Sequence, residues 1–382
     1  MENKRNTGIE LLKIVSMLMV VTLHVLLFGM NYYEAHILTP KGFITNMIEA
    51  ICYCAVNIYA IITGYLMVNK NPKVNRIVDL WIQVVFYLII STMLIRIYYP
   101  QDFTKRLLFG TFFPIITNQF WYFTAYFIMF WCIPLYNWII NHLTIEQFRR
   151  MIMTTLSIFC IIGWFASIYG EQVFGLNNGY SFLWITVLYF TGAGIKLYGK
   201  ELFYIKKDIS KNKVLLIGLL SGLSTFIAKV LLVKMTTFLF GHEIYVDIFY
   251  LYVSPTVLIE SICFIFYFSK LNIRSNTLIS KISGATFGIY IIHLTPFFLN
   301  YCWKYLTPYK NTSLVSYLLI ILVSVILLFT LCTVVEMIRL YVFDKLGFYK
   351  ITKKIYAKYQ KTIRILLIIN KILNVKTLIY TI

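Results

Sequence analysis

Long apolar stretches recur along the chain, separated by short polar segments. Stretches of roughly 20 apolar residues are long enough to cross a bilayer as helices, and ten of them lie at about 8–28, 43–67, 77–98, 119–140, 151–168, 180–198, 213–233, 245–268, 284–302 and 313–338. Backbone inside a bilayer must satisfy its own hydrogen bonds, which leaves helices or closed barrels. Barrel strands alternate in polarity over about ten residues, and these stretches do not. The pattern therefore predicts an all-α polytopic membrane bundle of about ten transmembrane helices.

The composition agrees with a membrane protein. Hydrophobic residues make up 60% of the chain and charged residues only 13%, whereas soluble domains carry about 25% charged residues. No small-residue cleavage pattern follows Phe28, so the first apolar stretch is expected to be retained and not removed as a signal peptide. We therefore expect a multi-pass protein of the plasma membrane, with the lipid bilayer as its surroundings.

Basic residues indicate which helix ends face the cytoplasm, because cytoplasmic loops are enriched in Lys and Arg. If the N-terminus is inside and ten spans alternate, only eight of the 35 basic residues lie on the outer side: Lys41, Arg96, Lys105, Arg106, Lys229, Lys234, Lys304 and Lys310. The inverted arrangement would reverse this bias. The sequence therefore predicts that both termini are cytoplasmic.

The net charge of +20 has to be read against this topology. In a soluble protein it would suggest nucleic acid, but here most of the excess faces the anionic inner leaflet, so no nucleic-acid partner is expected. A second interpretation is that part of this positive charge binds a cytoplasmic ligand that carries phosphates.

In residues 339–382 lysines alternate with Ile, Leu and Tyr, which is typical of an amphipathic helix on a membrane surface. We therefore expect a membrane domain over 1–338 and a basic cytoplasmic tail over 339–382.

Ionisable side chains share one face of the first apolar stretch. Glu10, Lys13 and His24 lie there, and the helical rise from Lys13 to His24 is about 16 Å. Ionisable groups in hydrocarbon are costly and by default mark a functional pathway. The alternative for His24 is a hydrogen bond to a neighbouring helix with no chemical role.

Other patterns narrow the function classes. The seven cysteines form no CxxC pair, and His and carboxylate residues are too few at ligand spacing for a metal site. The chain has no Gly-rich phosphate loop and no G-x-S-x-G nucleophile elbow. We expect neither a metal nor a bound cofactor. Gly192 and the pair Gly218 and Gly222 predict close helix packing.

Five short motifs follow one another along the predicted spans. They are Lys13-x10-His24, AVNIYAIITGYLMVN at 55–69, KVNR at 73–76, QFWYFTAYF at 119–127 and GIYIIHLTPFF at 288–298. In this order and spacing, over residues 8–338, they resemble the acyltransferase type 3 family of integral-membrane O-acyltransferases.

The resemblance implies acyl transfer across the membrane. Members of this family take an acetyl or similar group from cytoplasmic acyl-CoA, such as acetyl-CoA, and pass it to a hydroxyl of a cell-surface glycan or its lipid-linked precursor. It implies that His24 is essential and that the basic residues Lys13, Lys73 and Arg76 bind the acyl-CoA donor. No esterase domain is fused after the last span, so a transfer that needs a second protein is expected to use a separate glycan assembly protein.

The chain departs from the family pattern at two of these positions. Lysine stands at Lys13 and Lys73 where arginine is usual. A lysine meets a phosphate as a point charge, whereas an arginine offers a planar fork that binds in a bidentate way. The departure therefore bears on donor binding more than on catalysis.

Acyl transfer to a hydroxyl needs a group that removes the proton. A buried His24 is expected to be neutral, because burial disfavours the charged imidazolium, and it can then act as general base. A nucleophilic role with a transient acyl-imidazole is a second route, and the sequence leaves both open.

Two further ionisable residues lie inside apolar stretches. His293 precedes Pro296, and Glu260 lies in a helix that Pro255 is expected to kink. We consider both as catalytic candidates: His293 in a catalytic or acceptor-side role, and Glu260 as a carboxylate that orients His24 or pairs with a cation. For each, a structural hydrogen bond is the alternative.

Two other functions fit a bundle with ionisable residues in its spans. One is a transporter, although no inverted repeat and no paired broken helices are evident. The other is a non-catalytic partner in envelope polysaccharide assembly.

Overall fold

The protein is described here from a computed structural model, which describes residues 6–171, 173–205, 208–244, 247–348, 350 and 352. These residues form the α-helices α1 Thr7–His24, α2 Pro40–Cys52, α3 Ala55–Met67, α4 Val74–Tyr98, α5 Lys105–Phe112, α6 Trp121–His142, α7 Ile145–Leu156, α8 Gly163–Ile168, α9 Phe182–Tyr198, α10 Lys211–Phe240, α11 Pro255–Ser269, α12 Thr277–Ile292 and α13 Leu314–Lys345. No strand occurs in this described part of the chain. The predicted all-α class is confirmed.

Eight helical segments among the described residues are long and apolar enough to cross a membrane. They are Thr7–Gly29, Pro40–Met67, Val74–Tyr98, Trp121–His142, Ile145–Ile168, Phe182–Phe203, Lys211–Phe240 and Leu314–Lys345. The other two predicted spans contain the shorter helices α11 and α12, of 15 and 16 residues. The described residues thus contain eight long apolar helices and two shorter ones, and the count of about ten spans stays a prediction. The cytoplasmic location of both termini stays a prediction.

Proline explains why two predicted spans are short. Pro255 is the first residue of α11, a position where its missing N–H costs nothing, so it begins the helix and does not kink it. The preceding residues 247–254 form turns instead of helix. At the end of α12, the helix stops before Pro296, because a proline there cannot donate the next helical hydrogen bond.

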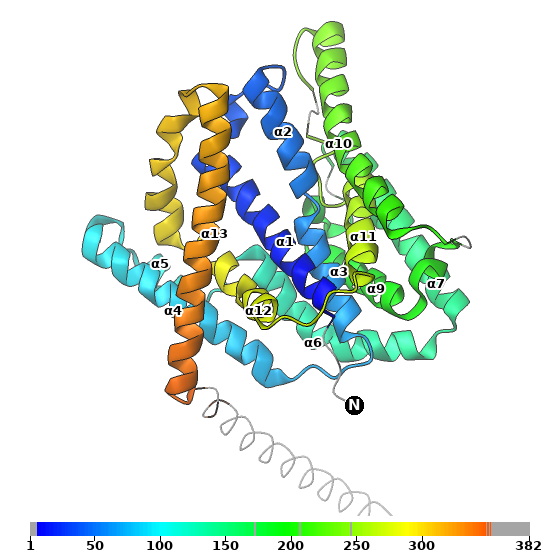
Figure 1. The fold of residues 1–382 in the computed structure, drawn as a ribbon, viewed down its shortest axis with the longest axis horizontal. Coiled ribbons are helices and arrows are strands. Elements are labelled where there is room, and N and C mark those ends of the chain that lie inside the picture. Colours follow the sequence, from blue (N-terminus) through cyan, green and yellow to red (C-terminus); the bar gives the residue numbers. More distant parts are fainter. Residues whose placement is uncertain are drawn as a thin grey trace, which may run out of the picture.

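The helix α1 runs through the middle of the bundle, between α13 and α10 (Figure 1). It contacts α2, α3, α11, α12 and α13. The start of α1 and the end of α13 lie at the same end of the bundle, at the bottom of Figure 1. This central place means that side chains on α1 face several other helices at once.

Small residues allow the closest helix contacts. A Cβ on Gly64 of α3 would lie 1.9 Å from the carbonyl oxygen of Tyr189, and one on Gly192 of α9 would lie 2.0 Å from that of Ile61. In α10, a Cβ on Gly218 would lie 2.9 Å from the Cβ of Cys263 in α11. The predicted close packing at Gly192 and Gly218 is confirmed, and Gly64 adds a close contact that was not predicted.

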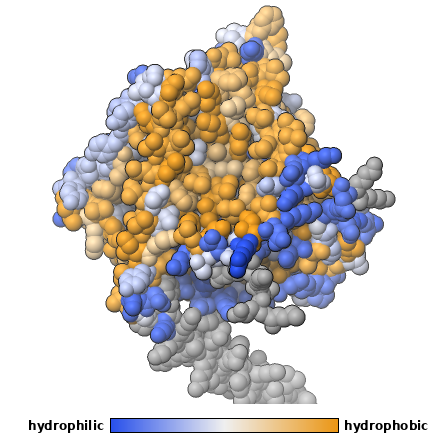
Figure 2. Space-filling model, viewed as in Figure 1, coloured by the Kyte–Doolittle hydropathy of each residue, from blue (hydrophilic) through white to orange (hydrophobic). Residues whose placement is uncertain are grey.

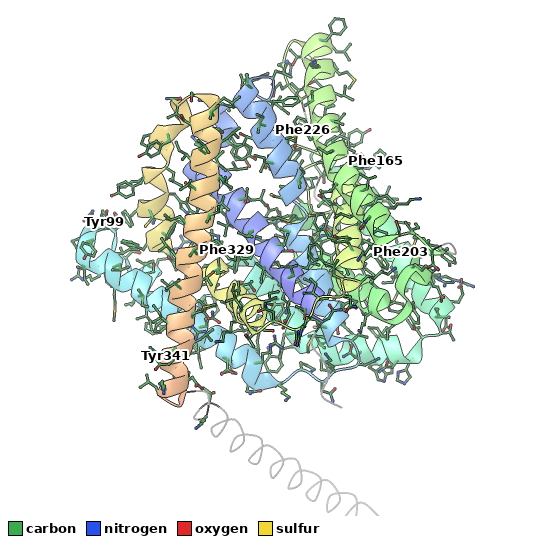
Figure 3. The ribbon with its side chains drawn as sticks, in the orientation of Figure 1. Tyr99, Phe165, Phe203, Phe226, Phe329 and Tyr341 are labelled. Atoms are coloured by element: carbon green, nitrogen blue, oxygen red, sulfur yellow. The ribbon has the colours of Figure 1, made fainter. Side chains whose placement is uncertain are left out.

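The surface agrees with a membrane setting. Hydrophobic residues dominate the face that Figure 2 displays, and hydrophilic residues gather along its lower rim. Aromatic side chains also fill gaps between helices: Phe226 lies between α2 and α10 (Figure 3), with its ring centroid 4.7 Å from that of Phe43.

The predicted tail begins within a helix. The helix α13 continues to Lys345, so the expected boundary between 338 and 339 falls inside it. Arg339, the first residue assigned to the tail, is buried in the bundle. The predicted amphipathic helix beyond residue 352 lies outside the described residues.

Candidate active site

His24 lies where α1 changes its winding. The helix starts at Asn6, whose side chain accepts a hydrogen bond from the N–H of Ile9 at 3.1 Å. After His24 the chain passes into a π-helical turn, Val25–Gly29. Such turns contain one extra residue and often occur at functional sites. They redirect the side chains that follow, so His24 is the last residue in the regular register of α1.

His293 lies at a second irregular place, after α12. Pro296 has no N–H, so it cannot bond to the carbonyl of Ile292 as a helix would require. Thr295 takes over this carbonyl: its N–H donates at 3.3 Å and its hydroxyl at 2.9 Å. The N–H of Phe297 donates to the hydroxyl of Ser91 on α4 at 2.9 Å. The interrupted segment is therefore held in place by hydrogen bonds.

The structure brings these two histidines together. Nδ1 of His24 lies 2.8 Å from Nε2 of His293, although the residues are far apart in the sequence. His293 is fully buried, and His24 is partly buried. His24, the predicted functional residue on α1, thus pairs with the imidazole of His293 from the segment after α12.

The partners of the rings fix which nitrogen carries each proton. Nδ1 of His293 contacts the backbone carbonyl of Ile289, and a carbonyl only accepts, so this nitrogen must be the N–H donor. In a neutral His293, Nε2 is then an acceptor, and Nδ1 of His24 must donate to it. Nε2 of a neutral His24 is left with its lone pair, and no described residue hydrogen-bonds to it. This nitrogen can accept a proton or attack an electrophile.

Aromatic rings close one side of the pair. The Phe28 ring stacks on His24 with 5.5 Å between centroids. Trp303 lies 5.9 Å from Phe28 and 6.4 Å from His293. These rings lower the local dielectric constant, which strengthens the hydrogen bond between the histidines.

The structure places Glu260 in a different environment from the histidine pair. This residue of α11 is completely buried, and a Cβ on Gly222 of α10 would lie 2.5 Å from its Oε1. Neither carboxyl oxygen has a hydrogen-bond partner among the described residues, and the Cys54 thiol lies beside it. No described contact joins Glu260 to His24. Burying an unpaired carboxylate is costly, so packing alone does not account for this residue.

Lys13 is half-buried on α1. The hydroxyl of Tyr59 on α3 donates to its backbone carbonyl at 2.6 Å. One turn earlier, Glu10 accepts a hydrogen bond from the hydroxyl of Ser280 at 2.7 Å. These bonds join α1 to α3 and α12 near the end where α1 begins.

Lys73 and Arg76 lie at the start of α4, and both are exposed. Lys73 is the residue that precedes the helix, and its carbonyl accepts from the N–H of Arg76 at 2.8 Å. The helix α4 begins at the same end of the bundle as α1 (Figure 1). Two cations at a helix N-terminus favour a negatively charged ligand.

Among the buried ionisable residues that were not singled out from the sequence are Glu49, Glu336 and Arg339. Glu336 and Arg339 of α13 form an ion pair of 2.5 Å, and the hydroxyl of Tyr87 donates to Glu336 at 2.7 Å. Glu49 of α2 is also buried and accepts from the hydroxyl of Tyr32. The signal for all three was a charge inside an apolar stretch. Glu336 and Arg339 neutralise each other's charge in their ion pair, which indicates a structural role.

Within the part of the chain that the structure describes, no group of three or more His, Cys, Asp or Glu could hold a metal ion. The open nitrogen of His24 is suited to acid–base or nucleophilic chemistry.

Comparison with known proteins gives one match. A family model described as an acyltransferase domain matches residues 6–337. No curated protein and no solved structure matches the chain. The matched range includes both histidines, Glu260 and the basic residues at the starts of α1 and α4.

Proposed function

The chain belongs to the acyltransferase type 3 family of membrane proteins, and on this premise we propose that it is an acyl-CoA-dependent O-acyltransferase. It moves an acyl group, in our proposal acetyl, from cytoplasmic acetyl-CoA to a hydroxyl of a cell-surface glycan, such as an exopolysaccharide, a capsule or a lipid-linked precursor. The observation that carries the proposal is the pair of His24 and His293, joined at 2.8 Å, with one nitrogen of His24 left open.

In the first route, His24 is a general base. Its Nε2 takes the proton of the acceptor hydroxyl while that oxygen attacks the thioester carbon. The C–S bond breaks, CoA leaves as a thiolate, and the thiolate takes the proton from Nε2. His293 keeps its acceptor nitrogen on Nδ1–H of His24 throughout, and so holds the ring in one tautomer.

In the second route, His24 is the nucleophile. Its Nε2 attacks the thioester carbon, CoA leaves as a thiolate, and a transient acyl-imidazole forms. The acceptor hydroxyl then takes the acyl group, and its proton passes to the thiolate. The bond to His293 is the same in both routes, so the proposal leaves both open.

The donor would lie at the end where α1 begins. We propose that Lys13, Lys73 and Arg76 bind the phosphates of acyl-CoA. The helical rise of about 16 Å from Lys13 to His24 would be spanned by the pantetheine arm, which carries the thioester. This arrangement agrees with a donor on the cytoplasmic side of the plasma membrane.

Glu260 stays a candidate with a role apart from the histidine pair. Among the described residues, neither of its oxygens has a partner in hydrogen-bonding geometry, although the Cys54 thiol lies beside them. We propose that transfer requires this carboxyl, and that glycan assembly proteins and the glycan itself are the partners on the acceptor side.

The experiment compares purified protein with a His24→Ala variant. Both are incubated with radiolabelled acetyl-CoA and with membranes from a strain that lacks the gene, and the radiolabel on the isolated glycan is then counted. We expect label on the glycan with the parental protein and less than a tenth of it with His24→Ala. A variant that retains more would contradict the assigned role of His24. Movement of an intact solute without label transfer would instead support a transporter, and neither result would support a non-catalytic assembly partner.

A further inference from the structure

A cavity of about 440 Å³ lies at the end of the bundle opposite the start of α1. It is bounded by the chain that follows the π-helical turn and by the beginnings of α2 and α13, which meet at the top of Figure 1. Its volume is within the range of small-ligand sites. Neutral hydrogen-bonding side chains line much of it: Asn31, Tyr32, Thr39, Asn311 and Tyr317.

One wall of the cavity is fixed from behind. Asn31 has a positive φ of 47°, which turns the chain after the π-helical turn and brings Tyr32 into the wall. The Tyr32 hydroxyl donates to one oxygen of the buried Glu49. The other oxygen of Glu49 has no described partner. The ring of Tyr32 is therefore held in a single position.

The cavity also contains two lysines. The ammonium of Lys41 donates to the backbone carbonyl of Lys310 at 2.7 Å, which joins the start of α2 to the segment before α13. It lies 5.4 Å from the ring centroid of Tyr317. An ammonium has three N–H donors, so Lys41 keeps two for a ligand. These two N–H groups can meet a negatively charged group of a ligand.

The cavity and the basic residues of the donor site lie on opposite sides of His24 along the chain. Met30 lines the cavity and follows His24 by six positions, a rise of about 9 Å at helical spacing. Lys13 lies in the other direction. A ligand in the cavity would therefore approach His24 from the side away from the donor.

We propose that this cavity binds an acidic sugar unit of the acceptor glycan, a claim that rests on the proposed function. Amide and hydroxyl side chains suit sugar hydroxyl groups, and an ammonium suits a carboxylate or phosphate on the sugar. The bound unit is a neighbour of the sugar that becomes acylated, because the cavity begins one sugar length or more from His24. Binding of this unit would hold the glycan so that the sugar to be acylated lies at His24.

The test measures sugar binding without turnover. The His24→Ala protein is titrated calorimetrically with oligosaccharides cut from the surface polysaccharide of the same organism, after mild base has removed their O-acetyl groups. Adding Lys41→Gln should weaken binding about tenfold, as expected for one charge-assisted hydrogen bond, and Asn311→Ala should weaken it severalfold. Lys234→Gln is the matched control, because Lys234 is exposed on α10 and does not line the cavity, and it should bind as the parent does.

The outcomes separate this proposal from the proposed function. Unchanged binding in both Lys41→Gln and Asn311→Ala would overturn the cavity assignment; Asn311 is exposed, so its truncation should not disturb folding. Binding that does not weaken with salt would overturn the acidic character of the sugar. If the cavity variants lose binding but the parental protein transfers no acetyl group, the proposed function fails and the sugar site stands.

Discussion

At the scale of single residues, His293 is oriented by its own helix. Its Nδ1 contacts the carbonyl of Ile289, and its Nε2 faces Nδ1 of His24 at 2.8 Å. Both ring nitrogens thus have protein partners, while only one nitrogen of His24 does. This asymmetry assigns the reacting nitrogen to His24 and a positioning role to His293.

If His293 positions His24, acyl transfer requires a hydrogen-bond acceptor at residue 293. We expect His293→Ala to lower the transfer rate by roughly 100-fold, within the range of a misplaced general base. His293→Gln should recover much of this loss, since its amide oxygen can accept from Nδ1 of His24. Initial rates of acetyl transfer measure both. The control is His242→Ala, because His242 is exposed. Equal losses in the Ala and Gln variants would contradict the role.

Glu260 gives the second residue-scale prediction. Glu260→Gln keeps the shape of a side chain whose oxygens have no described partner, so it should not lower the melting temperature. If transfer requires the carboxyl, the rate should fall more than tenfold. Thermal unfolding and initial rates, measured on the same preparation, separate the two effects. A normal rate with normal stability would show that Glu260 has no part in the reaction.

At the scale of helices, irregular segments make the site and close contacts support it. His24 precedes a π-helical turn and His293 follows the end of α12. The contact between α3 and α9, in contrast, depends on regular helices and on glycines that let the backbones approach. The bundle thus combines close packing of the regular helices α3 and α9 with irregular backbone next to His24 and His293.

The contact of α3 with α9 predicts the effect of one methyl group. In Gly192→Ala, the new Cβ would lie 2.0 Å from the carbonyl oxygen of Ile61, so the helices must separate, at a cost of about 1–3 kcal/mol. In the matched change Gly284→Ala on α12, nothing lies within 4 Å of the new Cβ. Alanine there should be neutral or should stabilise by up to about 1 kcal/mol. Thermal unfolding in detergent compares the two, and equal melting temperatures would contradict the packing argument.

At the scale of the whole molecule, the sequence predicts more of the fold than of the site. Apolar length and the absence of alternation predict the all-α class, and ten helical regions occur where the apolar stretches lie. The short α11 and α12 could not be anticipated from apolar length, because α11 begins only at Pro255 and α12 ends before Pro296. The approach of His24 to His293 depends on how α1 and α12 pack. Glu49 was not singled out although it is a charge inside an apolar stretch, because its burial and its bond with Tyr32 depend on how the helices pack.

The last prediction concerns the distribution of charge between the two ends of the bundle. If Arg76 holds a phosphate of acyl-CoA, Arg76→Ala should raise the KM for acetyl-CoA severalfold and leave kcat nearly unchanged, since His24 is remote from it. Because Arg76 is exposed, the contact is screened by salt, so added salt should raise the KM of the parental protein more than that of the variant.

Lys281→Ala is the matched control for this charge effect: Lys281 is an exposed lysine near the start of α12, and the proposal gives it no phosphate contact. Its KM should stay within twofold of the parental value at every salt concentration. If Arg76→Ala and Lys281→Ala raise the KM equally, the donor responds to the general positive charge of this end of the bundle and not to a site at α4. If neither changes it, the basic residues serve only the orientation of the protein in the membrane, for which a surplus of cations on one side is sufficient.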